Sequence, residues 1–521
     1  MAFLNIDVNN ANSSTAWWAY LATTIVLGIS ILFFRDERPY PGIPILGMEK
    51  GWFGMNSYYK TKKLQTLKLS RDTAQFKGKC YQVLSTTGFK IILPPSFLDE
   101  VKSKNELSFV DFIEHDFFAK FPGFGAFGAG SHDNIIQDTI KVKLSGSLAK
   151  VTDPLSEEMG IFLNSRLPVS TTQDWTEQSF RDISVASVAQ LSSRVFLGEN
   201  LCRDPRWLGL AIKYTTDVVA ATRAMRMWPR FSHPIIHWFL PQTRKARQDL
   251  KETHELVAPI LERRRQDQLE CSRNGLEYEK PVDALQWLED MTKGRALDIV
   301  NGQLLLSFAS IHTTSGLLQG VMYDLCANPE YIDLLRAEVI EQLSDHSDGW
   351  KKTSLHALKM MDSVLKESQR LNTVSLALIH RRVRDTITLS DNTVLPKGSA
   401  VATPTAQRML DPLIWPDSNK FVGRRFYDLR MQTGNENKAQ FVSTTVDHFG
   451  FGVGSHACPG RFFASNESKI ILVHLLMKYD WKFIDGRGRP ERIFLGHESF
   501  WDPKAKVLVK SRQSEIQFPG E

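Results

Sequence analysis

The stretch FGVGSHACPG, residues 451–460, holds one of only five cysteines in a chain of 521 residues. Its glycines let the backbone adopt conformations that are closed to other residues, and they let a flat group approach closely. The proline after the cysteine removes a backbone donor and stiffens the loop. Cys458 directly precedes a predicted helix that begins at Arg461, and the positive end of that helix favours a thiolate. The sequence therefore predicts a thiolate held in a rigid loop.

Such a thiolate is either a nucleophile or a metal ligand. His456 is a candidate base for a nucleophile, but it lies two residues before Cys458 and no acid is placed to orient it. The five cysteines are widely spaced and form no CxxC pair, which argues against a zinc site and against a disulfide framework. A single soft ligand in a rigid loop suits haem iron better.

The loop resembles the haem-binding loop of cytochromes P450. Its pattern FxxGxxxCxG is matched by four residues, Phe451, Gly454, Cys458 and Gly460. The continuation GRFFA is similar to filamentous-fungal members. The resemblance implies that Cys458 is the axial thiolate of haem b, iron protoporphyrin IX, and that Phe451 packs near the sulfur. His456 then stands where many members carry an arginine that contacts a haem propionate.

Two upstream motifs extend the resemblance. Taken alone, the ExxR pair of Glu367 and Arg370 is equally consistent with an ordinary ion pair on the solvent-exposed face of a helix. The segment FVGRRF, residues 421–426, is similar to the family's FxPxRF segment, with glycine in place of proline. The resemblance implies that Glu367, Arg370 and Arg425 form an ion network behind the haem. Such a network supports the thiolate loop and does no chemistry.

The long apolar segment 299–327 contains ASIHTT, residues 309–314, where the family has [AG]-G-x-[DE]-T-[TS]. Thr313 corresponds to the threonine that assists dioxygen activation; the alternative is a hydroxyl that bonds only to its own helix. His312 replaces the family's acid and Ser310 its glycine. We expect His312 to titrate near neutral pH and to take part in proton delivery.

The predicted propionate contacts depart from the family pattern. The expected WxxxR helix is represented only by SHDNIIQD, with His132 and Gln137 at the corresponding positions. One contact is therefore missing or is supplied by a neighbour such as Lys141. Arg382 is our first choice for a further propionate partner, and Arg381 is the second.

The predicted substrate pocket is mostly apolar. Its candidate lining residues, by family position, are Phe117, Ile311, Val374, Leu376 and Phe500. Each could equally be ordinary core. If they line a pocket, they indicate a lipophilic substrate. Similarity to fungal biosynthetic members suggests a terpenoid or meroterpenoid of secondary metabolism, including indole diterpenes, with a polyketide as the alternative.

The leading functional hypothesis is a haem-thiolate monooxygenase that inserts one oxygen atom from O2 into this substrate. No flavin or dinucleotide fingerprint appears in the chain, so electrons would come from NADPH through a separate cytochrome P450 reductase. One rival is an isomerase or dehydratase with the same haem site, and another is a non-catalytic haem-binding protein. The net charge of +6 is spread along the chain, which argues against nucleic-acid binding.

An apolar segment near the N-terminus predicts a membrane anchor. Residues 16–34 carry no charge and are about long enough to cross a bilayer core of roughly 30 Å. Arg35 and Arg38 follow, and the only earlier charge is Asp7, so the positive-inside rule places residues 1–15 in the lumen. A basic n-region, which a cleaved signal peptide would have, is absent. We therefore expect a single-pass protein of the endoplasmic reticulum, with Asn12 in a luminal glycosylation sequon.

The rest of the chain, residues 35–521, is predicted to lie in the cytosol. Residues 35–47 form a Pro-rich connector, and residues 48–521 are expected to form a single haem domain. The fold class is mainly α with small β-sheets, the cytochrome P450 fold, preceded by one N-terminal transmembrane helix. Helices are predicted over 250–268, 299–327, 355–371 and 461–478. Strands are predicted near Tyr81 and Lys90, and a hairpin over 385–399 is expected to turn at residues 391–392.

Overall fold

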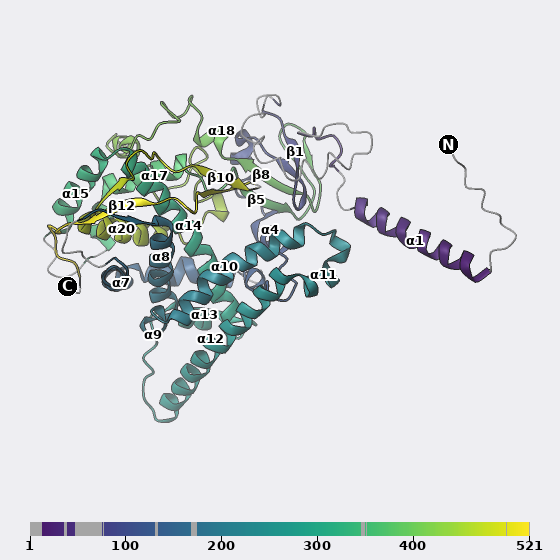
Figure 1. The fold of residues 1–521 in the computed structure, drawn as a ribbon, viewed down its shortest axis with the longest axis horizontal. Helices are drawn as coiled ribbons and strands as arrows, with labels where there is room; N and C mark the ends of the chain where they lie inside the picture. The colour runs from purple at the N-terminus through teal and green to yellow at the C-terminus, as the bar shows by residue number, and fades with distance from the viewer. Residues whose placement is uncertain are drawn as a thin grey trace.

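The computed structural model describes residues 13–35, 39–46, 76, 78–130, 134–167, 174–344, 350, 352–495 and 497–519. Helices make up most of this part of the chain; the largest of several small sheets lies at the upper right of Figure 1, and another lies among the helices at the left. This agrees with the predicted class, mainly α with small sheets.

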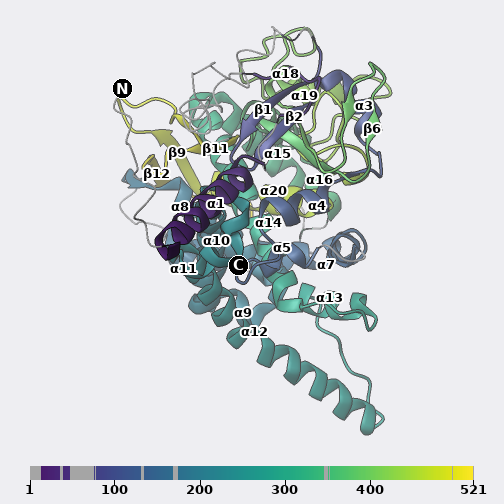
Figure 2. The same ribbon diagram turned by 90° about the vertical axis from the view of Figure 1, so that its right-hand side faces the viewer.

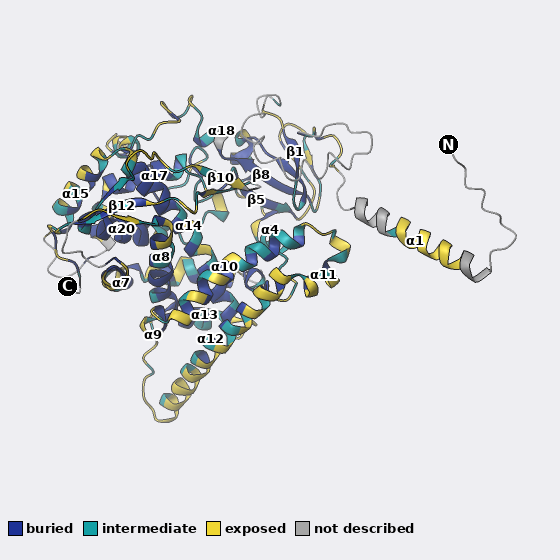
Figure 3. Cartoon of the chain, in the orientation of Figure 1, coloured by how far each residue is buried: buried dark blue, intermediate teal, exposed yellow. Residues whose placement is uncertain are grey.

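Helix α14 runs through the centre of the helical part. It spans Ile299–Ala327, begins where the Asp298 side chain accepts a hydrogen bond from the Asn301 backbone, and ends just before Pro329. Most of its side chains are buried, as expected for a helix that is apolar on nearly every face (Figure 3). It packs against helices α5 (Gly125–Gly128), α8 (Phe180–Leu197), α17 (Lys359–Leu371) and α20 (Arg461–Lys478).

The other helices surround this core. They are α3 (Leu98–Val101), α4 (Phe109–Asp116), α6 (Ile135–Asp138), α7 (Leu148–Arg166), α9 (Glu199–Cys202), α10 (Pro205–Arg226), α11 (His233–Phe239), α12 (Pro241–Arg273), α13 (Ala284–Thr292), α15 (Glu330–Leu343), α16 (Lys352–Ala357), α18 (Ala406–Met409) and α19 (Arg425–Arg430). Short helical turns occur at η3 (Pro95–Phe97), η4 (Thr139–Leu144), η5 (Arg230–Ser232) and η6 (Gly454–His456). Figures 1 and 2 both show the C-terminal part of α12 projecting from the body, and its side chains there are largely exposed.

The largest sheet has the strand order β1-β2-β8-β5-β3. Its strands are β1 (Tyr81–Ser85), β2 (Gly88–Ile92), β3 (Leu107–Ser108), β5 (Ala377–Val383) and β8 (Ala400–Pro404). Strands β2 and β8 are parallel, and the other neighbours are antiparallel. Smaller sheets join β6 (Ile387–Thr388) to β7 (Val394–Leu395), β10 (Arg492–Leu495) to β11 (Glu498–Trp501), and β12 (Val507–Ser511) to both β4 (Thr176–Gln178) and β9 (Tyr479–Phe483).

Several predicted elements are confirmed. Helices α14 and α20 have the predicted bounds, and strands β6 and β7 form the predicted hairpin. Asn392 has a φ of 67° at its turn, a conformation that asparagine tolerates better than most residues. Helix α12 is longer than the predicted 250–268, and the predicted helix 355–371 is divided into α16 and α17.

The N-terminal region contains a helix at the predicted anchor, α1 (Ser13–Arg35). Of the helices in the described residues, none is long and apolar enough to cross a membrane. The connector is bound to the largest sheet through Gln82, whose side-chain amide donates to the carbonyls of Tyr40 (2.9 Å) and Ile43 (2.6 Å). The backbone of Gln82 also bonds to Pro44 and Leu46. The proline-rich segment therefore lies on strand β1.

Candidate functional site

The loop before α20 has a conformation that requires glycine. The Cys458 backbone N–H donates to the Phe451 carbonyl (2.7 Å), which closes the loop. Gly454 has a φ of +73°, and a Cβ atom there would lie 2.2 Å from the Lys102 carbonyl oxygen. Neither the backbone angle nor this contact admits a side chain. The loop is thus held tightly against the end of helix α3.

The Cys458 thiol faces the N-terminus of α20. Burial raises the pKa of this thiol, while hydrogen bonds from the backbone N–H groups of Gly460 and Arg461 and the Arg461 charge act in the opposite direction. The Arg461 guanidinium also donates to the Cys458 carbonyl (2.8 Å). A half-buried sulfur with two backbone donors suits a thiolate whose charge is balanced by a bound cation. The residues present therefore fit the iron of a haem.

Helix α14 provides a second feature that fits haem. Ala309 and Thr313 are exposed although the helix is mostly buried, and they lie one turn apart on the same face. The Thr313 hydroxyl donates to the Ala309 carbonyl (2.7 Å). Its oxygen keeps its acceptor capacity and faces accessible space. Because α14 packs against α20, the helix that carries Thr313 adjoins the helix that follows Cys458.

His312 points elsewhere. Its Nε2 atom lies 2.6 Å from the Thr215 hydroxyl on α10, and that hydroxyl donates to the Ile212 carbonyl (2.7 Å). The hydroxyl therefore accepts a hydrogen bond from Nε2–H of His312. Burial, and to a smaller extent the Arg181 charge, lowers the pKa of His312 below its ordinary value of 6.5. Burial therefore favours the neutral imidazole, and the role of His312 in proton delivery stays a prediction.

Positive side chains gather beside the cysteine loop. Burial, followed by the charges of Arg381, Lys141 and Arg384, lowers the pKa of His456 to about 4. Arg381 is 4% exposed, and its Nη2 atom is buried without a hydrogen-bond partner. A buried guanidinium that lacks an anion is costly, so this cluster fits the carboxylates of a haem.

Arg382 lies on the other face of strand β5. Adjacent residues of a strand point in opposite directions, and Arg382 is influenced by Arg230 and Asp116 rather than by the cysteine loop. The geometry thus favours Arg381, our second choice, over Arg382. Of the predicted propionate region, His132 lies outside the described residues, and the Gln137 amide donates to the Gly130 carbonyl (3.3 Å).

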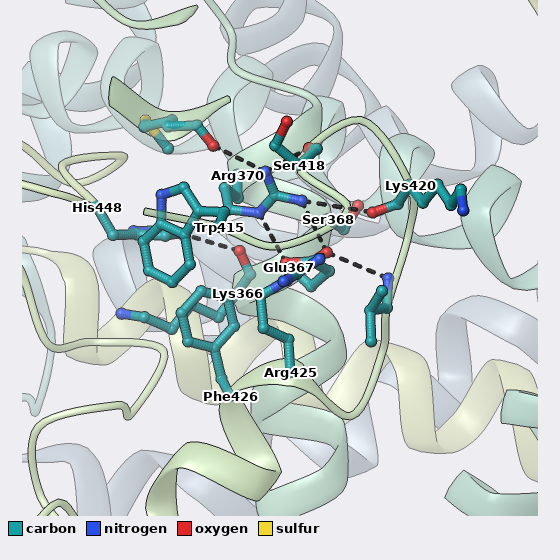
Figure 4. A network of polar contacts seen from close by, with 12 residues as sticks. Lys366, Glu367, Ser368, Arg370, Trp415, Ser418, Lys420, Arg425, Phe426 and His448 are labelled. Carbon is teal, nitrogen blue, oxygen red and sulfur yellow. Dashed lines mark hydrogen bonds and ion pairs between the residues drawn. The ribbon is translucent and has the colours of Figure 1, made fainter. Parts of the chain in front are cut away.

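The predicted ion network behind the loop is assembled in the structure (Figure 4). Arg370 Nε and Nη2 each lie 2.8 Å from a Glu367 carboxylate oxygen, and both side chains are fully buried. Arg425 Nε lies 3.0 and 3.1 Å from the same two oxygens. Arg370 also donates to the carbonyls of Met409 (2.8 Å) and Ser418 (2.6 Å). One carboxylate therefore joins α17 to the start of α19.

The departure from the family's FxPxRF segment has a local cause. A Cβ atom on Gly423 would lie 2.5 Å from the Tyr331 ring, so the ring of α15 occupies the space that a larger residue would need. The Gly423 carbonyl accepts a hydrogen bond from Ser363 (2.6 Å), and the Ser363 hydroxyl accepts from the backbone of Phe426 (3.1 Å). The segment is thereby fixed to α17 without a proline.

Further residues of α17 bind segments on either side of the cysteine loop and were not predicted from the sequence. Lys366 donates to the carbonyls of Gln440 (2.8 Å) and Ser443 (2.6 Å), and burial lowers the pKa of Lys366 to about 7. Asp362 accepts from Arg430 (3.0 Å) and Lys469 (2.8 Å). The sequence does show several charged residues within this short helix, but a helix face exposed to solvent shows the same pattern.

The predicted pocket residues fall into separate groups. Phe117 packs against Phe127 and Phe308, with ring centroids 4.6 and 5.9 Å apart, at the side of α14. Segment 374–376 pairs with the hairpin that carries Phe500, since the Ser499 backbone N–H donates to the Val374 carbonyl (3.1 Å).

The exposure of these residues also differs. Val374 and Phe500 are 43% and 45% exposed, and Leu376 is half-buried. Ile311 is 1% exposed and belongs to the main core.

Comparison with known proteins agrees with these features. The family model described as "Cytochrome P450" matches residues 78–509. The cytochrome P450 monooxygenase hepE of Aspergillus oryzae is 41% identical over 85% of this chain and 81% of its own length. The cytochrome P450 monooxygenase adrA of Penicillium rubens is 38% identical over 84% of this chain and 85% of its own. The cytochrome P450 monooxygenase trt6 of Aspergillus terreus is 38% identical over 97% of this chain and 99% of its own.

A family model that covers most of the chain and relatives that align along most of their own lengths point to one conclusion. This chain belongs to the cytochrome P450 family of monooxygenases, oxidoreductases that use haem with thiolate ligation and receive electrons from NAD(P)H through a reductase.

Proposed function

We propose that this chain is a haem-thiolate monooxygenase in which Cys458 is the axial ligand and Thr313 assists dioxygen activation. The observation that carries the proposal is the Cys458 loop, in which the backbone N–H groups of Gly460 and Arg461 bond to a half-buried thiol beside a central helix that exposes Thr313. When bound, haem supplies one-electron and oxygen chemistry that amino-acid side chains lack.

The supporting residues have distinct roles in this proposal. The N–H groups of Gly460 and Arg461 stabilise the thiolate, and the glycines of the loop allow close approach to the porphyrin. Arg381 and His456, with Lys141 beside them, hold the haem carboxylates. Glu367, Arg370 and Arg425 are positioning residues, because they hold the loop and touch neither haem nor substrate.

In this proposal the Thr313 hydroxyl, which donates to the Ala309 carbonyl, would offer Oγ1 as a hydrogen-bond acceptor where dioxygen is activated. His312 takes part from a neutral state, since it donates to Thr215 and keeps Nδ1 as an acceptor. An alanine at position 312 is expected to raise peroxide release relative to product. An unchanged ratio of peroxide to product in that variant would remove His312 from the proposal.

The substrate in this proposal is lipophilic, a terpenoid or meroterpenoid such as an indole-diterpene intermediate of fungal secondary metabolism. The aromatic group of Phe117, Phe127 and Phe308 beside α14 supports an apolar ligand. The alternative substrate is a polyketide, which would be oxidised by the same class of reaction.

Co-expression with NADPH–cytochrome P450 reductase tests the reaction. Cells fed lipophilic precursors under isotopically labelled dioxygen should give products that carry one labelled oxygen atom. Product formation without NADPH and without label would instead establish the isomerase or dehydratase alternative.

We further propose that residues 16–34 anchor the chain in the endoplasmic reticulum membrane, with residues 48–521 as one cytosolic haem domain. The support comes from the sequence, in which this segment carries no charge and is followed by Arg35 and Arg38. Expression of a tagged full chain and of a variant lacking residues 1–34, followed by carbonate extraction of membranes, tests this. Full extraction of the complete chain would contradict it.

A further inference from the structure

A cavity of about 570 Å³ lies apart from the cysteine loop. Its walls come from α4, from the end of α10 with the segment that follows it, and from the end of strand β5, which lie near one another in Figure 1. Of the residues considered above for haem binding, only Arg382 and Arg384 line this cavity. The cavity therefore needs an explanation of its own.

Its lining is strongly cationic. Among the described residues, the cationic side chains that line it are Lys120, Arg226, Arg230, Arg382, Arg384 and Lys397, whereas the acidic ones are Asp111 and Glu114. Two of the cations are already paired. Arg384 forms two hydrogen bonds with Asp111 (2.6 and 2.8 Å), and Lys397 bonds to Asp385 (3.0 Å). The excess positive charge of the lining therefore comes mainly from Lys120, Arg226, Arg230 and Arg382.

Three arginines of this lining form no ion pair with a carboxylate within the described part of the chain. Arg226 donates to the Asp116 backbone carbonyl (2.8 Å), and its buried Nε atom has no hydrogen-bond partner. Arg230 contacts the His115 ring nitrogen. Arg382 lines the same cavity as Arg230, and burial followed by the like charge of Arg230 lowers its pKa.

The nearest buried acid, Asp116, is shared among several cations. Asp116 is bound by Lys90 (2.8 Å), by the His115 ring (2.9 Å) and by the Thr87 hydroxyl (3.0 Å). Its charge also acts on Arg226 and Arg382, but it is shared with these partners, so the lining keeps an excess of positive charge. A group of like charges without a counterion raises the free energy of the native state, and a bound anion would lower it.

The remaining walls are apolar. Phe118, Phe121, Met227, Trp228 and Val383 line the same cavity as the arginines. Met227 and Trp228 are 65% and 45% exposed, so they form its rim. A hydrophobic wall beside the guanidinium groups of Arg230 and Arg382 matches a molecule with an apolar body and an anionic head.

We propose that this cavity binds the anionic head group, a carboxylate or phosphate, of an amphiphile, with Arg230 and Arg382 as its charge partners. The apolar body of the ligand lies against Phe118 and Trp228. The proposal does not depend on the reaction proposed above, because it concerns binding alone.

Calorimetric titration of the haem-loaded full chain without reductant tests the site, with dodecanoate and dodecanol as probes. We expect dodecanoate to bind about tenfold more tightly than dodecanol. Arg230→Gln and Arg382→Gln should each remove this preference and leave dodecanol affinity unchanged. Arg206→Gln, at the exposed start of α10, is the matched control and should leave both affinities unchanged.

A second arm distinguishes the source of the head group. Flotation with phosphatidylcholine vesicles is compared with flotation after one fifth of the lipid is replaced by phosphatidylserine. Arginine-dependent dodecanoate binding supports a free amphiphile, and arginine-dependent enrichment on phosphatidylserine supports a membrane lipid. If neither preference responds to the exposed Arg230→Gln change, which leaves the core intact, the proposal is overturned, whether or not the Arg382→Gln chain folds.

Discussion

The ion network behind the cysteine loop makes a quantitative prediction for Glu367→Gln. The Glu367 carboxylate accepts from Arg370 (2.8 Å twice), from Arg425 (3.0 and 3.1 Å) and from the Val422 backbone (3.1 Å). Glutamine keeps the volume but removes the only negative charge in this contact set. Two guanidinium groups then remain buried, since Arg370 is 0% and Arg425 is 9% exposed at the side chain.

Removal of one partner from a buried pair costs about 3–5 kcal/mol. At ~2.1 cal/mol/K per residue, a domain of this length loses roughly 1 °C of Tm per kcal/mol, so Tm should fall by about 3–5 °C. Thermal denaturation measures the shift, and the haem content of the purified protein should fall with it. Asp428→Asn is the control, because its ion pair with Arg424 is exposed and contributes at most about 1 kcal/mol. If Glu367→Gln melts within 1 °C of that control and keeps its haem, the account of the network is wrong.

Three further predictions concern other parts of the chain. Thr313→Ala should lower product formed per NADPH by about tenfold or more and raise peroxide, without a change in Tm, because the exposed hydroxyl bonds only within its own helix; a retained product yield would contradict its role. Gly454→Ala should abolish haem retention, as measured by haem absorbance. Gly398→Ala is the control, because Gly398 has a similarly positive φ but open space around it, and this variant should keep haem. Equal haem contents in the two variants would refute the steric argument. Burial holds the pKa of His474 well below 6.5, so the stability it contributes is present above pH 6.5 and is lost as pH falls. Urea unfolding should show that His474→Gln reduces the loss of stability between pH 7 and pH 5 by about 2 kcal/mol; an unchanged loss would contradict this assignment.

The sequence predicts the central helices well. Helix α14 is apolar on nearly every face and ends at Asn328-Pro329, and α20 follows a loop fixed by glycine and proline. The signals at these ends are local, so both pairs of bounds were predictable. The division of the predicted helix 355–371 into two helices was not predictable. Leu358 interrupts the helix with a ψ of 74°, and the Glu338 carboxylate accepts hydrogen bonds from the backbone N–H groups of Met360 and Met361 just after it. That partner lies on α15.

The site was predictable where motif spacing determines it, and less so where side-chain direction does. Glu367, Arg370 and Arg425 meet as their motifs imply. The choice between Arg381 and Arg382 depends on which face of β5 points to the cysteine loop, and Ile379, with a φ of 54°, interrupts the strand just before them. Strand alternation counted from the sequence alone does not reveal such an irregularity.

The position of the His312 ring likewise depends on a distant partner. Its hydrogen bond to Thr215 joins α14 to α10, which is nearly a hundred residues earlier in the chain. Spacing within residues 309–314 carries no information about that contact or about the burial that accompanies it.

The central claim, that Cys458 is the axial ligand of a haem-thiolate site, is tested most directly by the carbon monoxide spectrum of the reduced protein. The account predicts that the wild-type chain gives the red-shifted Soret band of a thiolate-bound haem, and that Cys458→Ser lacks this band. An unshifted Soret band in the wild type, or a red-shifted band that persists in Cys458→Ser, would contradict it.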